Sequence, residues 1–198
     1  MKIQIDKPAF MEGLETVKGT VGKETHLPIL RGVKITASEG NLLLHTTNLS
    51  TGTRASLKKV TVIEPGEALC DAAKLLSIVK NLPESTLTLA TLENHFVNVA
   101  CGKARFTLHG LRPDEFPQAI TPPEENSFDI SEEFFSTLSK VKNAASKDEI
   151  RFNLNGVYFN NDIVATDGHR LHLVKKSYPF KEIIVPLEFV NLLLRLKR

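Results

Sequence analysis

Asp167 and His169 are the two side chains whose types and spacing most readily suggest chemistry. They lie in the run Ala165–Leu171 (Ala-Thr-Asp-Gly-His-Arg-Leu), and a carboxylate beside an imidazole can act as a general acid and base. No serine, cysteine or second carboxylate stands at a spacing that would complete a catalytic set. Asp-Gly is also a common turn signal, and Gly168 readily adopts a positive φ. A small enzyme that uses Asp167 and His169 therefore stays as an alternative beside a purely structural turn.

The other reactive side chains predict neither a metal site nor a cofactor. Cys70 and Cys101 lie in apolar runs, which is typical of buried thiols in a reducing compartment. Neither the cysteines nor any pair of histidines has the spacing of metal ligands. Glycine-rich loops of the nucleotide-binding kind are absent from the sequence.

Composition limits the classes of protein that remain. The chain has 198 residues, with 25 basic and 23 acidic side chains, and its formal net charge of +2 does not indicate a polycationic nucleic-acid binder. The N-terminus alternates like a strand and lacks the apolar core of a signal peptide. No apolar run approaches the roughly 20 residues that span a bilayer. We therefore expect a cytoplasmic protein with no membrane partner.

The elements that must position these residues form a repeat. Two helices are expected, one capped by Asp6 with Lys7 and Pro8 in its first turn, the other capped by Ser131. Both carry the same apolar stripe at a constant offset of 124 residues. The stripes are Phe10, Leu14 and Val17 in the first helix and Phe134, Leu138 and Val141 in the second.

Matching hairpins follow each of these helices. The first runs from Gly32 to Asn48 with a turn at 38–41, and the second from Gly156 to Asp167 with a tighter turn at 160–162. Each leads to a further helix, expected over Asp71–Asn81 in the first copy and from Pro186 onward in the second. The first copy alone adds three strand-like segments, which are Thr86–Thr91, Phe96–Ala100 and Ala104–His109.

A repeat of roughly 120 residues has the size of a domain rather than of a solenoid unit. The sequence therefore predicts an α+β protein with domains at 1–121 and 122–198, each with two helices packed on antiparallel sheets. Alternation also predicts a strand that places Ile150, Phe152 and Leu154 on its core face. The last helix, with Leu192–Leu194 and no strands after it, would leave apolar surface uncovered, so we expect an incomplete second domain and an N-terminal fragment.

Several motifs in a fixed order resemble one known family. They are Leu27–Leu30, Lys103–Leu108 leading to Asp114–Pro117, Leu154–Gly156, Thr166–Leu171 and Ile184–Pro186. Together they cover the whole chain and resemble the bacterial replicative sliding clamp, the β subunit of the chromosomal DNA polymerase. The resemblance implies the DNA-clamp fold. It covers domain one and about two thirds of domain two, with domain three absent from this chain.

The resemblance implies a processivity factor without chemistry of its own. Clamps of this family are head-to-tail homodimeric rings whose helices line the central hole. The implied partners are duplex DNA, bound without sequence specificity, the catalytic subunit of the replicative polymerase, and the clamp loader. A non-clamp protein-interaction module built from the same repeat is the remaining alternative.

The resemblance also implies a cleft that binds a short partner peptide. Gly168 would let the partner backbone approach, and Leu154 and Leu171 would provide apolar wall. Thr166, His169 and Arg170 would supply polar edges.

Lysines on the helices form the second candidate site, although a solvated helical face is an equally good reading of any one of them. The residues implied to face DNA are Lys23, Lys74, Lys80, Lys140 and Lys142, and Lys7 and Lys18 lie on the first helix. Glu24 stands next to Lys23 where the family commonly has arginine, which leaves the contact of that loop open.

Overall fold

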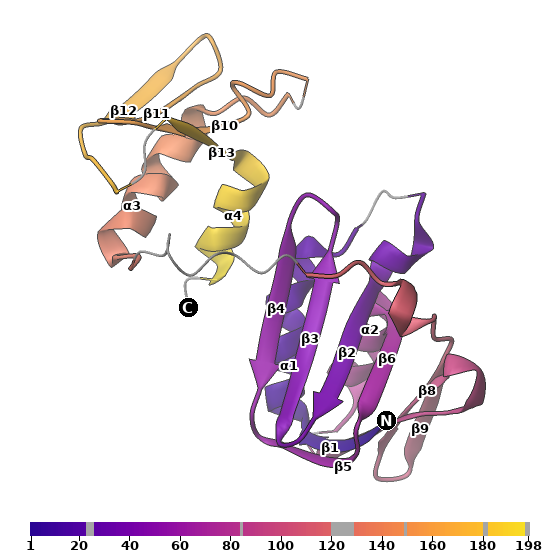
Figure 1. Cartoon of the computed structure of the whole chain (residues 1–198). Helices are drawn as coiled ribbons and strands as arrows, with labels where there is room; N and C mark the ends of the chain where they lie inside the picture. The colour runs from indigo at the N-terminus through magenta and orange to yellow at the C-terminus, as the bar shows by residue number, and fades with distance from the viewer. Residues whose placement is uncertain (23–25, 84, 120–128, 149, 180–181, 197–198) are drawn as a thin grey trace. The chain divides into compact units, whose positions relative to one another are not determined.

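The computed structural model describes residues 1–22, 26–83, 85–119, 129–148, 150–179 and 182–196. The chain divides into two compact units, unit 1 (Met1–Ile120) and unit 2 (Thr121–Arg198). Each unit contains a pair of α-helices and antiparallel β-sheet (Figure 1). The α+β class predicted from the sequence is confirmed.

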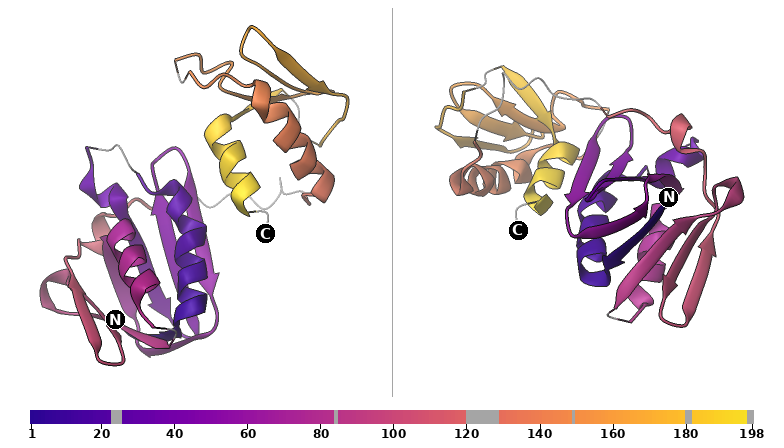
Figure 2. Two further views of the ribbon diagram at one scale, coloured as in Figure 1. Left: turned by 180° about the vertical axis from the view of Figure 1, so that it is seen from behind. Right: turned by 60° about the horizontal axis from the view of Figure 1, so that its bottom comes forward.

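Unit 1 contains a pair of helices and two antiparallel sheets. Its strands and helices are β1 (Lys2–Asp6), α1 (Lys7–Val17), β2 (Gly32–Ser38), β3 (Asn41–Thr47), β4 (Gly52–Leu57), β5 (Val60–Glu64), β6 (Gly66–Asp71), α2 (Ala72–Asn81), β7 (Thr86–Thr91), β8 (Val97–Cys101) and β9 (Ala104–Leu108). The sheets have the strand orders β5-β1-β7-β8-β9 and β4-β3-β2-β6. The helices pack against each other on one side of the second sheet (Figure 2).

The two helices of unit 1 begin in different ways. Asp6 occupies the N-cap of α1 in an extended conformation, but its side chain makes no capping hydrogen bond and instead accepts one from Thr86 Oγ1 at 3.3 Å. Asp71 does cap α2, because its Oδ1 accepts a hydrogen bond from Lys74 N at 2.8 Å. The sequence predicted Asp6 as a cap, and it occupies that position without the capping bond, whereas the cap formed by Asp71 was not predicted.

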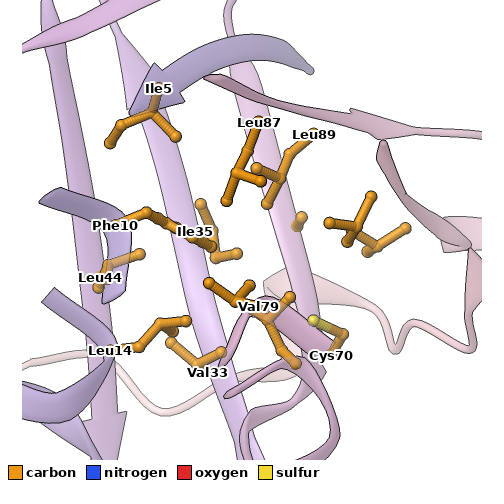
Figure 3. Close-up of a cluster of buried hydrophobic side chains, with 14 of the residues drawn as sticks. Ile5, Phe10, Leu14, Val33, Ile35, Leu44, Cys70, Val79, Leu87 and Leu89 are labelled. Carbon is orange, nitrogen blue, oxygen red and sulfur yellow. The ribbon is translucent and has the colours of Figure 1, made fainter. Parts of the chain in front are cut away.

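The core of unit 1 lies where the helices meet the sheets. Phe10 and Leu14 of α1 point toward strand residues such as Ile35 and Leu44 (Figure 3). Cys70 belongs to the same cluster, and burial raises the pKa of its thiol to about 12. Since the thiolate is the reactive form, Cys70 is inert near neutral pH, as expected of a buried structural thiol.

Unit 2 repeats the helix and hairpin elements of unit 1. Its elements are α3 (Glu132–Val141), the 3₁₀ turn η6 (Lys142–Ala144), β10 (Gly156–Phe159), β11 (Ile163–Thr166), β12 (Leu171–Val174), β13 (Ile183–Pro186) and α4 (Leu187–Leu196). Ser131 caps α3 as predicted, with its hydroxyl accepting from Phe134 N at 3.3 Å. The sheet order β12-β11-β10-β13 reproduces β4-β3-β2-β6 of unit 1, with every pair antiparallel.

Gly32 and Gly156 open equivalent strands and are both required by a close approach. A Cβ on Gly156 would lie 2.7 Å from the carbonyl oxygen of Val185, and one on Gly32 would lie 2.6 Å from Leu69 Cδ1. Real Cβ contacts of this length essentially do not occur, so both positions exclude a side chain unless neighbouring atoms move.

The strand predicted over 150–154 is wrong. Ile150 and Phe152 are 88% and 73% exposed and lie in turns rather than on a core face. Asp148 Oδ1 accepts from Ile150 N at 3.0 Å, and Arg151 O accepts from Leu154 N at 2.8 Å. These backbone groups are satisfied locally, so the apolar alternation does not lead to a sheet ladder.

Candidate functional site

The turn at Thr166–Leu171 joins β11 to β12 and is closed by its own side chains. Thr166 Oγ1 accepts from Gly168 N at 3.1 Å and donates to Arg170 O at 2.7 Å. Asp167 Oδ1 accepts from the backbone N–H groups of His169 and Arg170, both at 3.0 Å. The polar side chains of Thr166 and Asp167 therefore form hydrogen bonds with the backbone of the turn itself.

Asp167 is held as a carboxylate. Hydrogen bonds from the N–H groups of His169 and Arg170 lower the pKa of Asp167, and the Arg170 side chain adds to this with an Nε–Oδ2 distance of 2.9 Å. A carboxyl with a lowered pKa is a weak base, and its oxygens are already engaged. The geometry therefore gives no support to acid–base chemistry by Asp167 and His169.

Gly168 adopts a φ of +91°, in the region that favours glycine. A Cβ built on it would meet no atom within 4 Å, so the space above it is open. The positive φ is by itself sufficient reason for a glycine at position 168. An approach of a partner backbone over Gly168, implied by the resemblance, stays a prediction.

An apolar row crosses the outer face of the unit 2 sheet beside this turn. Tyr158 pairs with Val164 and Ile184, and Val164 pairs with Leu173, so these side chains share one face of four strands. Leu171 lies two residues before Leu173 on that face, and the two are 58% and 46% exposed. This row, Leu173–Val164–Tyr158–Ile184, offers an apolar surface next to the polar turn.

Leu154 does not belong to the turn. It is half-buried in the loop before β10, and its carbonyl accepts from Ser146 N at 2.9 Å. Ser146 follows η6, which packs against β11 and β12. The structure therefore brings together the five predicted cleft residues that lie within 166–171. Leu154 is connected to them only indirectly, through Ser146 and the adjoining turn η6.

The lysines of unit 1 differ in their availability. Lys74 and Lys80 of α2 are exposed, as a contact with DNA requires. Lys7 is buried, and its Nζ donates to the carbonyls of Leu82 at 2.6 Å and Lys80 at 3.3 Å. A DNA role for Lys7 is therefore wrong, because its ammonium group binds the carbonyls at the end of α2.

Lys18 pairs with Glu15 one turn earlier on α1, so its charge is already partly balanced. Lys23 and Glu24 lie outside the described residues, and the expectation about their loop stays a prediction.

The lysines of unit 2 line a hollow between α3 and α4. Lys140 is exposed, and Lys142 Nζ donates to Asn191 Oδ1 of α4 at 2.7 Å. The hollow has a volume of about 510 Å³ and is lined by Phe135, Ser136, Ser139, Lys140, Lys142 and Leu194. Sequence reasoning named the two lysines but missed Ser136, Ser139 and Asn191. A comparison of the two helix pairs, position by position, would have singled them out.

Within the described ranges, no group of three or more His, Cys, Asp or Glu side chains could hold a metal ion. Among the helices that the structure describes, none is long and apolar enough to cross a membrane.

Comparisons with known proteins agree with this architecture. The chain is 30% identical over 207 residues to the beta sliding clamp of Vibrio cholerae, covering 98% of this chain and 57% of that protein. It is 29% identical over 206 residues to the beta sliding clamp of Escherichia coli K12, covering 99% of this chain and 56% of that protein. The chain thus spans about half the length of the curated relatives it matches.

Solved structures show the same fold. The sliding clamp of Bartonella birtlesii superposes with a TM-score of 0.91 at 29% identity, over 99% of this chain and 56% of that one. The clamp of Bacillus subtilis gives a TM-score of 0.90 at 27% identity, over 98% of this chain and 56% of that one. The sequence profile of the DNA polymerase III beta subunit, N-terminal domain, matches residues 1–121. Because this match covers more than half of the chain, the protein belongs to the DNA polymerase III beta subunit family.

Proposed function

We propose that this chain acts within a sliding clamp, a non-catalytic processivity factor that encircles duplex DNA in the cytoplasm. The observation that carries the proposal is the repeated helix pair, α1 with α2 in unit 1 and α3 with α4 in unit 2. In each pair one helix bears exposed lysines, Lys74 and Lys80 on α2 and Lys140 on α3. Lysine contacts to phosphate are independent of base sequence, which suits a protein that must slide.

The proposed ring is a head-to-tail homodimer, and β9 is a suitable strand for the contact between protomers. It forms an edge of its sheet and exposes Phe106 at 43%. An edge strand presents unpaired backbone N–H and C=O groups to another chain.

The proposed partner cleft consists of Leu154, Thr166, Gly168, His169, Arg170 and Leu171, and its peptide ligands come from the replicative polymerase and the clamp loader. The apolar row beside the turn supports this, because a short peptide gains most of its affinity from a few buried anchors. The equivalent row of unit 1 is Arg54–His45–Lys34–Leu69, which contains two cationic side chains, Arg54 and Lys34. Burial lowers the pKa of His45 in this row. Phe116 already packs on His45 there, with ring centroids 5.2 Å apart.

Peptide binding to the full-length protein tests the cleft. Replacing His169 and Leu171 by alanine should weaken a polymerase tail peptide by roughly 1–3 kcal/mol in calorimetric titration. The control is Leu49→Ala with Ser50→Ala in the equivalent turn of unit 1, which should leave affinity unchanged. Ser50 is the counterpart of His169, and Leu49 is the exposed leucine of that turn. Equal affinity of the cleft variant and the control, both folded and dimeric, would exclude this assignment.

DNA retention tests the helix lysines. Replacing Lys74, Lys80 and Lys142 by glutamate in the full-length protein should weaken loading and retention on circular DNA similarly for every sequence, and the deficit should shrink as salt rises. Lys58→Glu with Lys59→Glu, exposed residues between β4 and β5, is the control. A loss confined to one DNA sequence contradicts encirclement.

A further inference from the structure

The hollow between α3 and α4 has the chemistry of an anion site. Its polar lining is Ser136, Ser139, Lys140 and Lys142, which supplies two hydroxyls and two ammonium groups and contains no carboxylate. Phosphate oxygens accept hydrogen bonds from both kinds of donor, and more strongly from charged ones.

Lys142 is held at this hollow by a residue of the opposite helix. Its Nζ donates to Asn191 Oδ1 at 2.7 Å, and the contact is partly buried. A lysine side chain is flexible, so ordering it on a ligand costs conformational entropy. The hydrogen bond to Asn191 orders the Lys142 side chain before a ligand binds and so reduces that entropy cost.

The matching positions of unit 1 have the opposite character. At the 124-residue offset between α1 and α3, Glu12 and Glu15 stand where unit 2 has Ser136 and Ser139. Lys18, the counterpart of Lys142, pairs with Glu15. Carboxylates at these positions repel phosphate, so the α1 face is unsuited to an anion.

Asn191 also has no polar counterpart in unit 1. At the 115-residue offset between α2 and α4, the equivalent residue is Leu76, which packs against the unit 1 core. The two serine hydroxyls of the hollow and the hydrogen bond from Lys142 to Asn191 are therefore particular to unit 2.

We propose that the hollow between α3 and α4 seats one backbone phosphate of duplex DNA, with Asn191 as the residue that positions Lys142. The inference rests on the proposed clamp function and goes beyond it. It assigns hydroxyl contacts to Ser136 and Ser139, and it makes unit 2, not the α1 face of unit 1, the stronger phosphate-binding surface.

The salt dependence of DNA binding tests the proposal. The dissociation constant of the 198-residue chain for a short duplex is measured by fluorescence anisotropy at several low salt concentrations. Lys142→Gln should lower the slope of log affinity against log salt by about 0.9, the value for one phosphate contact. Asn191→Leu removes no charge, yet it should lower the slope by a similar amount and weaken binding about threefold to tenfold at low salt.

Three further variants separate positioning from folding. Asn191→Gln keeps an amide oxygen and should retain most of the slope, and the double variant with Lys142→Gln and Asn191→Leu should lose no more than Lys142→Gln alone. Ser136→Glu with Ser139→Glu, the residues of unit 1, should weaken binding without a change in thermal unfolding of more than a few degrees. Lys74→Gln on α2 lowers the slope independently of Asn191.

The outcomes distinguish this inference from the clamp proposal. If the duplex binds and Lys74→Gln lowers the slope while Lys142→Gln and the double serine variant do not, the phosphate seat is wrong and the clamp proposal stands. If Lys142→Gln lowers the slope but folded Asn191→Leu does not, Asn191 is not a positioning residue. If no duplex binds at low salt, the phosphate site is wrong, whereas the clamp proposal is decided separately by retention of the full-length protein on circular DNA.

Discussion

The turn at Thr47–Gly52 in unit 1 and the turn at Thr166–Leu171 in unit 2 lie 119 residues apart and are closed by the same threonine hydrogen bonds. The hydroxyl of Thr47 donates to the carbonyl four residues later at 2.9 Å, and that of Thr166 does so at 2.7 Å. Each hydroxyl also accepts from the N–H two residues later, at 3.0 Å and 3.1 Å.

The second residue of each turn is equivalent as well. Asn48 Oδ1 accepts from the N–H groups two and three residues later at 3.1 Å and 2.7 Å, and Asp167 Oδ1 accepts from the same two positions at 3.0 Å. The third residue is left-handed in both, with φ of +76° at Leu49 and +91° at Gly168.

The backbone of this turn therefore belongs to the repeated fold and not to one particular function. What differs is the side chains that it presents. Unit 1 has Leu49, Ser50, Thr51 and Gly52 where unit 2 has Gly168, His169, Arg170 and Leu171. Peptide binding at this turn that is particular to unit 2 must therefore arise from these side chains and from the apolar row beside them.

The largest expected effect comes from removing the bridging hydroxyl. Thr47→Val should destabilise unit 1 by about 1–3 kcal/mol, because Thr47 is buried and Leu49 N would lose its acceptor. Thr166→Val should cost unit 2 less, about 1 kcal/mol, since water can reach that turn. Hydrogen exchange of slow amides in each unit measures both values. A larger loss at Thr166 would contradict this ranking.

A smaller effect is expected from exchanging the left-handed residues. Gly168→Leu should destabilise unit 2 by about 1 kcal/mol, because a side chain with a Cβ is strained at positive φ although no neighbour would clash. Leu49→Gly should relieve the same strain and stabilise unit 1 by up to about 1 kcal/mol. Denaturant unfolding followed by unit-specific NMR signals measures the pair. Changes of the same sign would show that the two turns are not equivalent.

The smallest effect concerns acid. The hydrogen bonds from the N–H groups of His169 and Arg170 lower the pKa of Asp167 below the ordinary 3.8. The stability contributed by Asp167 is therefore fully present above pH 3.8 and is lost as the pH falls through the lower folded value. Amide shifts of 168–170 should titrate in that range in the native protein and stay flat in Asp167→Asn. The equivalent amides of 49–51 should not follow this titration, because Asn48 carries no proton that can dissociate there.

The sequence pattern predicted the elements of the fold well where several weak signals agreed. The stripe of Phe10, Leu14 and Val17 and its copy at Phe134, Leu138 and Val141 both mark helices in the structure. The turns at 38–41 and 160–162 joined the expected strands. Binary patterning was sufficient there because local propensity and tertiary burial favour the same structure.

Contacts between distant residues could not be read from such patterns. Lys7 has the spacing of a surface residue, and only the fold places the carbonyls of Lys80 and Leu82 within reach of its ammonium group. The alternation of Ile150, Phe152 and Leu154 suggested a strand, yet local bonds around Asp148 and Arg151 form turns instead. The Lys142–Asn191 contact likewise joins residues on two helices 49 positions apart.

The position of β1 in its sheet has a consequence for how unit 1 is made. Strand β1 pairs with β5 on one side and with β7 on the other, so its ladder joins residues 2–6 to residues as distant as 86–90. During translation at about 5–20 residues per second, the first strand waits roughly 5–20 s before its last partner has been synthesised. The strands that the structure describes in unit 2 lie within residues 156–186, so the ladders among them join residues much closer in sequence. Although β1 is made first, its ladder with β7 can therefore form only after residues 86–90 have been synthesised.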